Sequence, residues 1–292
     1  MKYFLLLSLC VCLNLFAHAD EWISKKIQYS LIDEPIDVVI VSHPKDKEVI
    51  PRCIKGVRKY CKNVRRVIVV STEKLTDEAE WFDEKLFPFS YKEVELAVGG
   101  GTQKKADKFF GQHNRGPGWY LQQLLKLYSA FVIPDISSNV LIVDADVVFL
   151  KPVKFMNKSL GGLFCVSQIE PKKLYIQHAE RLVPSYKRIL PQYYSVCHHM
   201  LFQRPILEDL FHTVEDYHGK PFWKAFCLCV NLDQNKGASE FEIYFSFAFN
   251  HTKQVEVRKL KWVNSSKIHK KEEFKRDGYH FASFHTYLRG IH

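Results

Sequence analysis

Three short apolar runs constrain the fold of this 292-residue chain more than any other feature: IDVVIV at residues 36–41, RVIVV at 66–70 and NVLIV at 139–143. A strand with one face in water alternates apolar and polar residues, whereas a strand covered on both faces is apolar throughout. A segment that reads as a helix up to about Tyr60 separates the first two runs. This strand–helix–strand order predicts an α/β fold with a mostly parallel central sheet flanked by helices.

The spacing of apolar residues and glycines predicts further helices, strands and loops along the chain. WYLQQLLKLYSAFV at 119–132 has the spacing of an amphipathic helix. Residues 74–90 are expected to be irregular, and 98–118, which contain three consecutive glycines, are expected to form a long mobile connection. No linker-like segment divides the chain, so residues 20–292 are expected to form one domain. Further strands are predicted at 163–169, 198–202, 255–257 and 281–284, and further helices at 171–189, 205–217 and 239–249.

The first 19 residues, MKYFLLLSLCVCLNLFAHA, have the form of a secretory signal. Lys2 precedes a short apolar core, and Ala17 and Ala19 provide a small-x-small cleavage site before Asp20. We therefore expect an exported protein, located in a periplasm, in a secretory lumen or outside the cell. The alternative is that this segment stays uncleaved and tethers the protein to a membrane. Six cysteines follow the segment, and they are expected to be mostly buried thiols, with room for one or two disulfides.

The charge balance restricts the expected partners. Lys and Arg outnumber Asp and Glu by 42 to 32, which gives a formal net charge of +10. This excess suits an acidic substrate, a phosphorylated ligand or peripheral contact with an anionic membrane surface. No basic block or known nucleic-acid motif is found, so no nucleic-acid partner is expected.

Two carboxylates interrupt the most strand-like part of the chain, where burying a charge is unfavourable. Asp144 and Asp146 follow the apolar run at 139–143 directly, and VVFL follows them. Alternate residues on an extended chain share a face, so both side chains are expected to point the same way. Oxygen ligands at the carboxyl end of a buried strand suit Mg²⁺ or Mn²⁺, which commonly bridge a diphosphate. The simpler interpretation is a surface turn with two solvated acids.

The segment IVDADVVFLKPV at 142–153 resembles the Asp-x-Asp segment of GT-A-fold glycosyltransferases. The chain as a whole is similar to a bacterial family of predicted glycosyltransferases without a defined substrate. This resemblance implies a GT-A-like, Rossmann-like domain and metal-dependent transfer of a sugar from a UDP- or GDP-sugar to a carbohydrate, lipid or protein acceptor. The other matching segments, in chain order, are VVIVSHPKD at 38–46, GWYLQQLLKLYSA at 118–130, HHMLFQRPILEDL at 198–210, SEFEIYFSF at 239–247 and FHTYLR at 284–289.

The resemblance also implies roles for individual residues. Asp144 and Asp146 would bind ribose and metal, with His285 as the third metal ligand. Glu240 would lie near the acceptor as the general base of an inverting enzyme. The side chains implied to contact the nucleotide or its phosphates are those of Ser42, His43, Asp46, Arg115, Gln122 and Lys126, and His198 and His199 would border the sugar pocket.

Several of these side chains have simpler explanations. His43 could satisfy a backbone carbonyl at the end of a strand, and Lys126 could be an exposed helix charge. Glu240 could be a first-turn acid favoured by the helix dipole. His285 could be a core histidine among aromatic residues.

Two other functions fit parts of the sequence. Asp144-Ala-Asp146-Val-Val148 matches the nucleophile strand of a haloacid-dehalogenase-type phosphatase, although about 120 mature residues precede it and no later acidic pair completes that site. A non-enzymatic, exported carbohydrate-binding protein agrees with the signal segment and the 14% aromatic content. Nucleotidyl transfer would use similar metal chemistry, but it usually needs a Gly-rich basic loop after the first strand, which Ser42-His43-Pro44-Lys45 does not provide.

Overall fold

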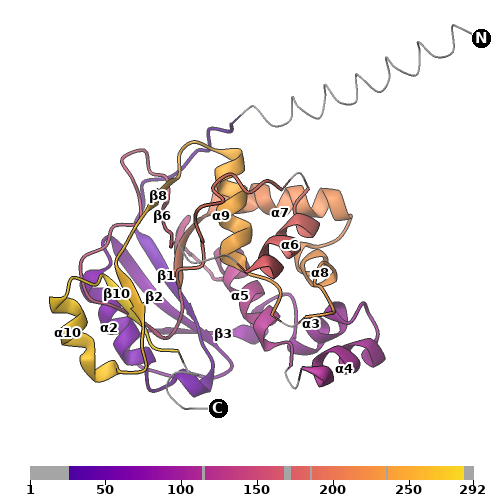
Figure 1. The fold of residues 1–292 in the computed structure, drawn as a ribbon, viewed down its shortest axis with the longest axis horizontal. Coiled ribbons are helices and arrows are strands. Elements are labelled where there is room, and N and C mark those ends of the chain that lie inside the picture. Colours follow the sequence, from indigo (N-terminus) through magenta and orange to yellow (C-terminus); the bar gives the residue numbers. More distant parts are fainter. Residues whose placement is uncertain (1–25, 114–115, 168–171, 185, 235, 286–292) are drawn as a thin grey trace, which may run out of the picture.

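The computed structural model describes residues 26–113, 116–167, 172–184, 186–234 and 236–285. A five-stranded sheet in the order β3-β2-β1-β4-β7 forms its centre (Figure 1). The first four of these strands run parallel, and β7 is antiparallel to β4. This is the α/β fold with a mostly parallel sheet that the sequence predicts. In chain order the strands are β1 (Ile36–Val41), β2 (Val64–Ser71), β3 (Glu80–Asp83), β4 (Asn139–Val143) and β7 (His199–Gln203).

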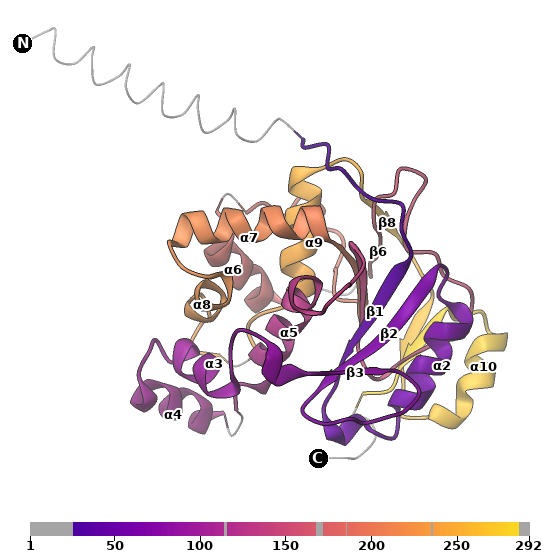
Figure 2. The ribbon, with the colours of Figure 1, turned by 180° about the vertical axis from the view of Figure 1, so that it is seen from behind.

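Helices cover both faces of this sheet, as Figures 1 and 2 show from opposite sides. One face packs against α2 (Ile50–Tyr60). The other face packs against the long helix α5 (Gly118–Val132) and the helices around it. These are α3 (Tyr91–Val98), α4 (Gln103–Gln112), α6 (Lys173–Leu182), α7 (Arg204–His218), α8 (Phe222–Leu228) and α9 (Glu240–His251).

Successive residues of the central strands belong to opposite cores, which explains their continuous apolar character. In β1, Val39 and Val41 pack with the α5 layer, while Val38 and Ile40 pack with α2. Because a strand's side chains alternate between the two faces, an apolar residue is needed at each of these positions.

Two small sheets of short strands lie beside the central sheet, and one of them includes the strand that follows the Asp-x-Asp segment. β5 (Val147–Phe149) pairs antiparallel with β10 (Phe281–Ser283), which pairs parallel with β9 (Trp262–Asn264). A second small sheet joins β6 (Leu163–Cys165) to β8 (Glu256–Arg258). The helix α10 (Lys271–Arg276) and the 3-10 helices η1 (Pro44–Asp46), η2 (Glu84–Leu86) and η3 (Ile268–Lys270) complete the described elements.

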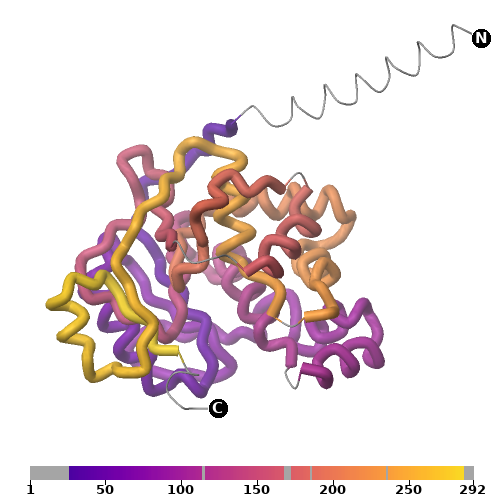
Figure 3. Tube along the Cα trace, viewed as in Figure 1, coloured from indigo at the N-terminus to yellow at the C-terminus, as the bar shows by residue number. Residues whose placement is uncertain are grey.

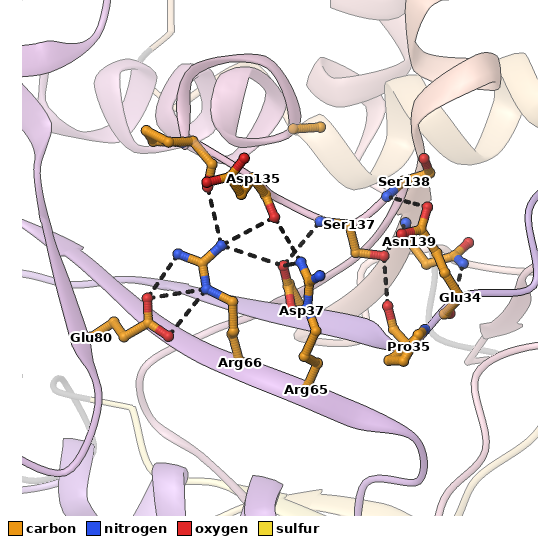
Figure 4. A network of polar contacts seen from close by, with 12 residues as sticks. Glu34, Pro35, Asp37, Arg65, Arg66, Glu80, Asp135, Ser137, Ser138 and Asn139 are labelled. Carbon is orange, nitrogen blue, oxygen red and sulfur yellow. Dashed lines mark hydrogen bonds and ion pairs between the residues drawn. The ribbon is translucent and has the colours of Figure 1, made fainter.

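A network of ion pairs fixes the amino-terminal edge of the central sheet (Figure 4). Asp37 of β1 is fully buried and accepts hydrogen bonds from Arg65, at 3.0 and 2.6 Å, and from the backbone N–H of Ser137, at 2.9 Å. Arg66 of β2 binds Glu80 of β3 at 2.7 Å. The network joins three strands to the loop before β4, and it lies at the opposite end of the strands from Asp144.

The predicted strands and helices are found, most with shifts of one or two residues, but the strand predicted at 163–169 ends at Cys165 and the helix predicted at 171–189 ends at Leu182. Two predictions of irregular structure are wrong. The segment at 98–118 contains α4, and the segment at 74–90 contains β3. In α4, Ala106, Phe109 and Phe110 are buried at helical spacing. A Cβ atom at Gly99 would lie 2.6 Å from the Ala106 backbone nitrogen, so the glycine there permits close helix packing rather than mobility.

The six cysteines beyond the N-terminal segment are buried free thiols in the structure. Residues 1–19, for which the sequence predicts an export signal or a tether, lie outside the described residues. Within the described ranges, no helix has both the length and the apolar character needed to cross a bilayer.

We expect Gly56→Ala to destabilise the protein, because a Cβ at Gly56 would lie 2.9 Å from the backbone nitrogen of Phe149. Forcing α2 away from β5 in this way should lower the free energy of unfolding by about 1–3 kcal/mol in a urea titration. Gly111→Ala is the matched control, since nothing lies within 4 Å of its Cβ position. That change should be neutral or stabilising by up to about 1 kcal/mol. Equal effects of the two changes would contradict this packing.

His199 should make stability depend on pH. Its ring lies among Phe149, Phe155 and Phe281, neither ring nitrogen has a well-formed hydrogen bond to the described residues, and burial lowers its pKa to about 3. The stability due to neutral His199 is therefore present above the unfolded pKa of about 6.5 and is lost as pH falls below it. The loss should be about 1.4 kcal/mol per pH unit.

His199→Phe should accordingly reduce the slope of unfolding free energy against pH on the acid side of about pH 6.5. The control, His212→Phe, changes an exposed histidine of α7 and should leave that slope unchanged. Identical slopes for the wild type and His199→Phe would contradict the account.

Candidate functional site

A cavity of about 550 Å³ opens at the carboxyl ends of β1 and β2, beside the first turns of α5. Ligands in open α/β sheets bind at this edge. Its wall contains Ser42, His43, Asp46 and Gln122, so the structure brings together four residues that the sequence predicts at a nucleotide site. The other lining residues are Val41, Pro44, Lys45, Thr72, Glu84, Tyr91, Gly116, Gly118, Trp119, Leu121, Leu125 and Lys236.

Ser42 is the clearest sign that this cavity binds a polar ligand. It is buried, and its hydroxyl has no hydrogen-bond partner in the described structure. An unsatisfied buried hydroxyl is unfavourable, and a ligand oxygen or nitrogen would satisfy it. His43 has a local role as well, because its Nδ1 accepts a hydrogen bond from the backbone N–H of Lys45 at 3.2 Å and caps η1.

Next to the cavity, Lys126 forms the centre of a buried charge cluster. It follows Gln122 by one helical turn of α5, so both side chains lie on the same face of that helix. Its ammonium group donates to Asp144 Oδ1 at 2.5 Å and to Glu240 Oε1 at 2.7 Å. The Lys126 side chain is 4% exposed, so its interpretation as an exposed helix charge is wrong.

The pKa values in this cluster follow from its contacts. Burial alone would lower the pKa of Lys126, but Asp144 and Glu240 together raise it above its usual value. Burial alone would raise the pKa of Asp144, but Lys126 and His198 hold it well below its usual range. Burial raises the pKa of Glu240, and Lys126 opposes that rise only in part. Lys126 is therefore charged, and Asp144 is ionised at neutral pH.

His198 supports Asp144 from the adjacent strand. Its Nδ1 lies 3.3 Å from Asp144 Oδ2, and its carbonyl accepts the Asp144 N–H at 2.9 Å. His198 has φ 63°, a left-handed conformation that is uncommon for a residue other than glycine and is often found at functional sites. The antiparallel pairing of β4 with β7 sets this position, because Val143 pairs with His199.

Asp146 contacts two side chains from the C-terminal part of the chain. Ser283 donates its hydroxyl hydrogen to Asp146 Oδ1 at 3.0 Å, and His285 Nδ1 lies 2.8 Å from Asp146 Oδ2. Ser283 and His285 are two residues apart on an extended segment and therefore face the same way. The His285 ring is 4.8 Å from the His198 ring, measured between centroids. The two aspartates thus belong to one continuous cluster rather than to a solvated turn.

The cavity and this cluster are neighbours because β1 and β4 pair in register. The pairing runs as far as Val39 opposite Ile142, and β1 ends at Val41 while β4 ends at Val143, just before Asp144, so both chains leave the sheet at the same edge. Neighbouring strands are about 4.8 Å apart. Val41 and Ser42 line the cavity, which places the cavity at the same edge of the sheet as the first aspartate.

Asp146 and His285 contact each other directly at 2.8 Å, and they could contribute to a divalent-cation site if that contact opens. A carboxylate and an imidazole suit Mn²⁺, and Mg²⁺ or Mn²⁺ typically takes its remaining ligands from water and substrate phosphates. Within the described ranges, no group of three or more His, Cys, Asp or Glu residues has an arrangement that could hold a metal by itself. A metal here would therefore need oxygen ligands from the substrate or from water.

For three other predicted site residues, the described structure does not show the predicted contacts. Glu240, predicted as a general base, is 1% exposed and paired with Lys126, and it does not line the cavity. Arg115 lies outside the described residues. Asp144 has both oxygens engaged by Lys126 and His198, so its predicted contact with ribose or metal would need one of these bonds to change.

Sequence reasoning missed Ser283 and the aromatic wall of the cavity. Ser283 could have been found from its spacing of two residues before His285 on a predicted strand. Trp119 and Tyr91 line the cavity, and the ammonium group of Lys236 lies 5.3 Å from the Trp119 ring centroid. Tyr91 comes from α3, and no local pattern indicates that this helix approaches the start of α5.

The fold and this site define an α/β protein with a cavity of mixed polar and apolar lining and a cluster of charged side chains at the carboxyl edge of its sheet. The chain belongs to a family of unknown function, DUF6492, whose model matches residues 31–274. No curated protein matches it significantly.

Among solved structures, the chain is similar to the apo structure of WbbM, a bifunctional glycosyltransferase. The sequence identity is 10%, the match covers 89% of this chain and 47% of that one, and the TM-score is 0.43. The chain therefore spans about half the length of WbbM. It is also similar to an active-site mutant of LgtC, with 12% identity, coverage of 85% of this chain and 86% of that chain, and a TM-score of 0.40.

Lys126→Met should destabilise the fold strongly, because it leaves Asp144 and Glu240 without their shared cation. Removing one partner of a buried ion pair lowers the free energy of unfolding by about 3–5 kcal/mol. A urea titration would show this loss as a lower midpoint. Adding Glu240→Gln to this variant should restore part of the loss, since one of the two carboxylates is then neutral. The control, Lys104→Met, changes an exposed lysine of α4 and should shift stability by less than about 0.5 kcal/mol. Wild-type stability in Lys126→Met would contradict the assigned role.

Proposed function

We propose that this protein is a metal-dependent glycosyltransferase that moves a sugar from a nucleotide sugar to an acceptor hydroxyl. The observation that carries the proposal is that a cavity and the Asp144–Asp146 cluster lie at the same carboxyl edge of the sheet and are joined by α5, whose Gln122 lines the cavity and whose Lys126 binds Asp144. In a GT-A-like domain, such a cavity binds the nucleotide while the paired acids face its diphosphate. The volume of about 550 Å³ falls within the range of small-molecule sites.

The cavity wall supplies suitable contacts for a nucleoside. The Ser42 hydroxyl needs a partner, and Gln122 offers both a donor and an acceptor on its amide. Trp119 and Tyr91 provide aromatic surface, and the wall carries two lysines, Lys45 and Lys236, and two acids, Asp46 and Glu84. Aromatic surface beside hydrogen-bonding groups favours a ligand with a planar ring and polar substituents, such as the nucleoside of a UDP- or GDP-sugar.

The metal of the proposed reaction is Mn²⁺ or Mg²⁺, held by Asp146 and His285 together with substrate oxygens. When bound, it supplies Lewis-acid stabilisation of the charge that develops on the leaving diphosphate. Ser283 orients the Asp146 carboxylate through its hydrogen bond to Oδ1. Such supporting contacts fix the direction of a ligand side chain.

Lys126 and His198 orient Asp144 and keep it ionised beside the cavity. Glu240 remains the candidate base for an inverting reaction. Its raised pKa suits that role, but its pairing with Lys126 has to open before an acceptor hydroxyl can reach it. If the transfer retains configuration, Glu240 acts only as the charge partner of Lys126.

The phosphatase alternative would use Asp144 as a nucleophile. Both of its oxygens are engaged, by a lysine and a histidine, and within the described ranges no acidic pair stands opposite the two aspartates. The carbohydrate-binding alternative predicts sugar binding without bond cleavage. Activity measurements separate the three functions.

Purified protein with Mn²⁺ should slowly hydrolyse UDP-glucose or GDP-mannose to the nucleoside diphosphate, and a chelator should abolish the reaction. Asp146→Asn should reduce the rate by about 100-fold or more, because it removes a charge that acts on the developing diphosphate. Asp216→Asn, on the exposed surface of α7, is the matched control and should keep the wild-type rate.

Two results would overturn the proposal. Cleavage of p-nitrophenyl phosphate in place of nucleotide sugars would indicate a phosphatase. Binding of free saccharides with no cleavage of any nucleotide sugar would indicate a carbohydrate-binding protein.

A further inference from the structure

The positive charge of the chain is concentrated on one part of the molecule. We call residues 47–62, 151–158 and 256–277 the basic lobe. These ranges contain 17 Lys and Arg against 5 Asp and Glu, a formal net charge of +12. The whole chain has 42 against 32, so the remainder has 25 against 27 and is slightly acidic. The excess charge of the protein therefore belongs to this lobe alone.

The three ranges are distant in sequence but form one body. Lys62 N–H donates to the Val153 carbonyl at 2.9 Å, and Val153 N–H donates to the Tyr60 carbonyl at 2.8 Å. The Lys275 ammonium group lies 5.7 Å from the Tyr60 ring centroid, which joins α10 to α2. Arg258 donates to the Lys154 carbonyl, which joins the third range to the second. Figures 1 and 2 both show α2 and α10 side by side at one end of the molecule.

Most of this charge faces solvent and is not neutralised locally. Two ion pairs in the lobe, Lys270 with Glu273 at 3.1 Å and Lys271 with Glu272 at 3.7 Å, are confined to η3 and α10. The exposed basic residues include Arg52, Lys55, Arg58, Lys59, Lys62, Lys154, Lys158, Lys259, Lys261, Lys267 and Arg276. Like charges at this density repel one another, so the surface favours an anionic partner.

The lobe adjoins the start of the described chain. Tyr29 N–H donates to the Gln254 side chain at 2.8 Å, and the Asn157 side chain donates to the Gln254 carbonyl at 2.8 Å. Figure 3 shows the indigo start of the described chain beside the segment that follows α9. Of the two roles predicted for residues 1–19, a retained tether would bring this end of the protein to a membrane, whereas a cleaved export signal would not keep it there.

We propose that the basic lobe docks on an anionic phospholipid surface. Within the described ranges, none of the exposed large hydrophobic residues belongs to the lobe, so contact is electrostatic and requires no insertion. Phospholipid headgroups offer many negative charges in a plane, which suits lysines and arginines spread over two helices and a loop. A nucleic-acid partner fits less well, because exposed aromatic residues for base stacking are absent from the lobe's described part. This docking does not depend on the proposed glycosyl transfer.

Vesicle sedimentation tests the proposal with the full chain in every sample, so any contribution of residues 1–19 is constant. Wild-type protein should sediment with vesicles of phosphatidylcholine plus phosphatidylglycerol more than with phosphatidylcholine alone. The difference should disappear at about 1 M salt, where the Debye length is about 3 Å. The triple variant Lys55→Glu, Lys59→Glu and Arg276→Glu should bind the anionic vesicles at least about tenfold more weakly.

The matched control makes the same change of charge on α4, at the far end of the molecule: Lys104→Glu, Lys105→Glu and Lys108→Glu. It should retain most of the wild-type vesicle binding. Thermal unfolding checks that both variants are folded, and Gln in place of Glu at the lobe positions should give an intermediate loss. Equal losses in the two triple variants, or no preference for phosphatidylglycerol, would overturn the proposal. Binding of duplex RNA without vesicle binding would overturn it too and would identify the partner as nucleic acid.

Discussion

The buried cation of Lys126 is the interaction on which the arrangement of the site depends. It joins α5 to the end of β4 through Asp144 and to the start of α9 through Glu240. Two carboxylates so close together could not both remain ionised in the interior without a shared positive charge. The same lysine therefore holds three elements together and keeps Asp144 charged at the edge of the sheet. The contact that stabilises the fold here is therefore also the contact that sets the charge of Asp144.

The positions of the other site residues follow from how the strands pair. The parallel pairing of β1 with β4 brings the end of β1, where Val41 lines the cavity, to the same edge of the sheet as Asp144. The antiparallel pairing of β10 with β5 brings Ser283 and His285 to Asp146 from the end of the chain. The site is thus assembled from segments more than 200 residues apart in the described chain, from Ser42 to His285. The basic lobe is separate from this site, because its helix α2 packs on the opposite face of the sheet from α5.

Much of the fold could be predicted from sequence because the central strands are apolar on both faces and α5 has a regular amphipathic pattern. The position of Asp144 and Asp146 at a strand end could be predicted for the same reason. The burial of Lys126 could not, because a lysine on a helix normally faces solvent and only the tertiary contact with Glu240 shows otherwise. α4 was missed because the three glycines before it resemble a loop, whereas one of them, Gly99, permits α3 to pack closely on α4. Ser283 could have been found only through its spacing of two residues before His285, because nothing else near it in the sequence indicates that it faces Asp146.

The account rests on the claim that the Asp146–His285 pair and the adjacent cavity hold a cation and a nucleoside diphosphate together. The most direct measurement is a crystal structure of the protein grown with UDP and Mn²⁺, with anomalous diffraction recorded for manganese. The account predicts an anomalous peak in contact with Asp146 and His285 and a uridine in the cavity lined by Ser42 and Gln122. Manganese and nucleotide at another place, or a cavity that stays closed to both, would contradict it.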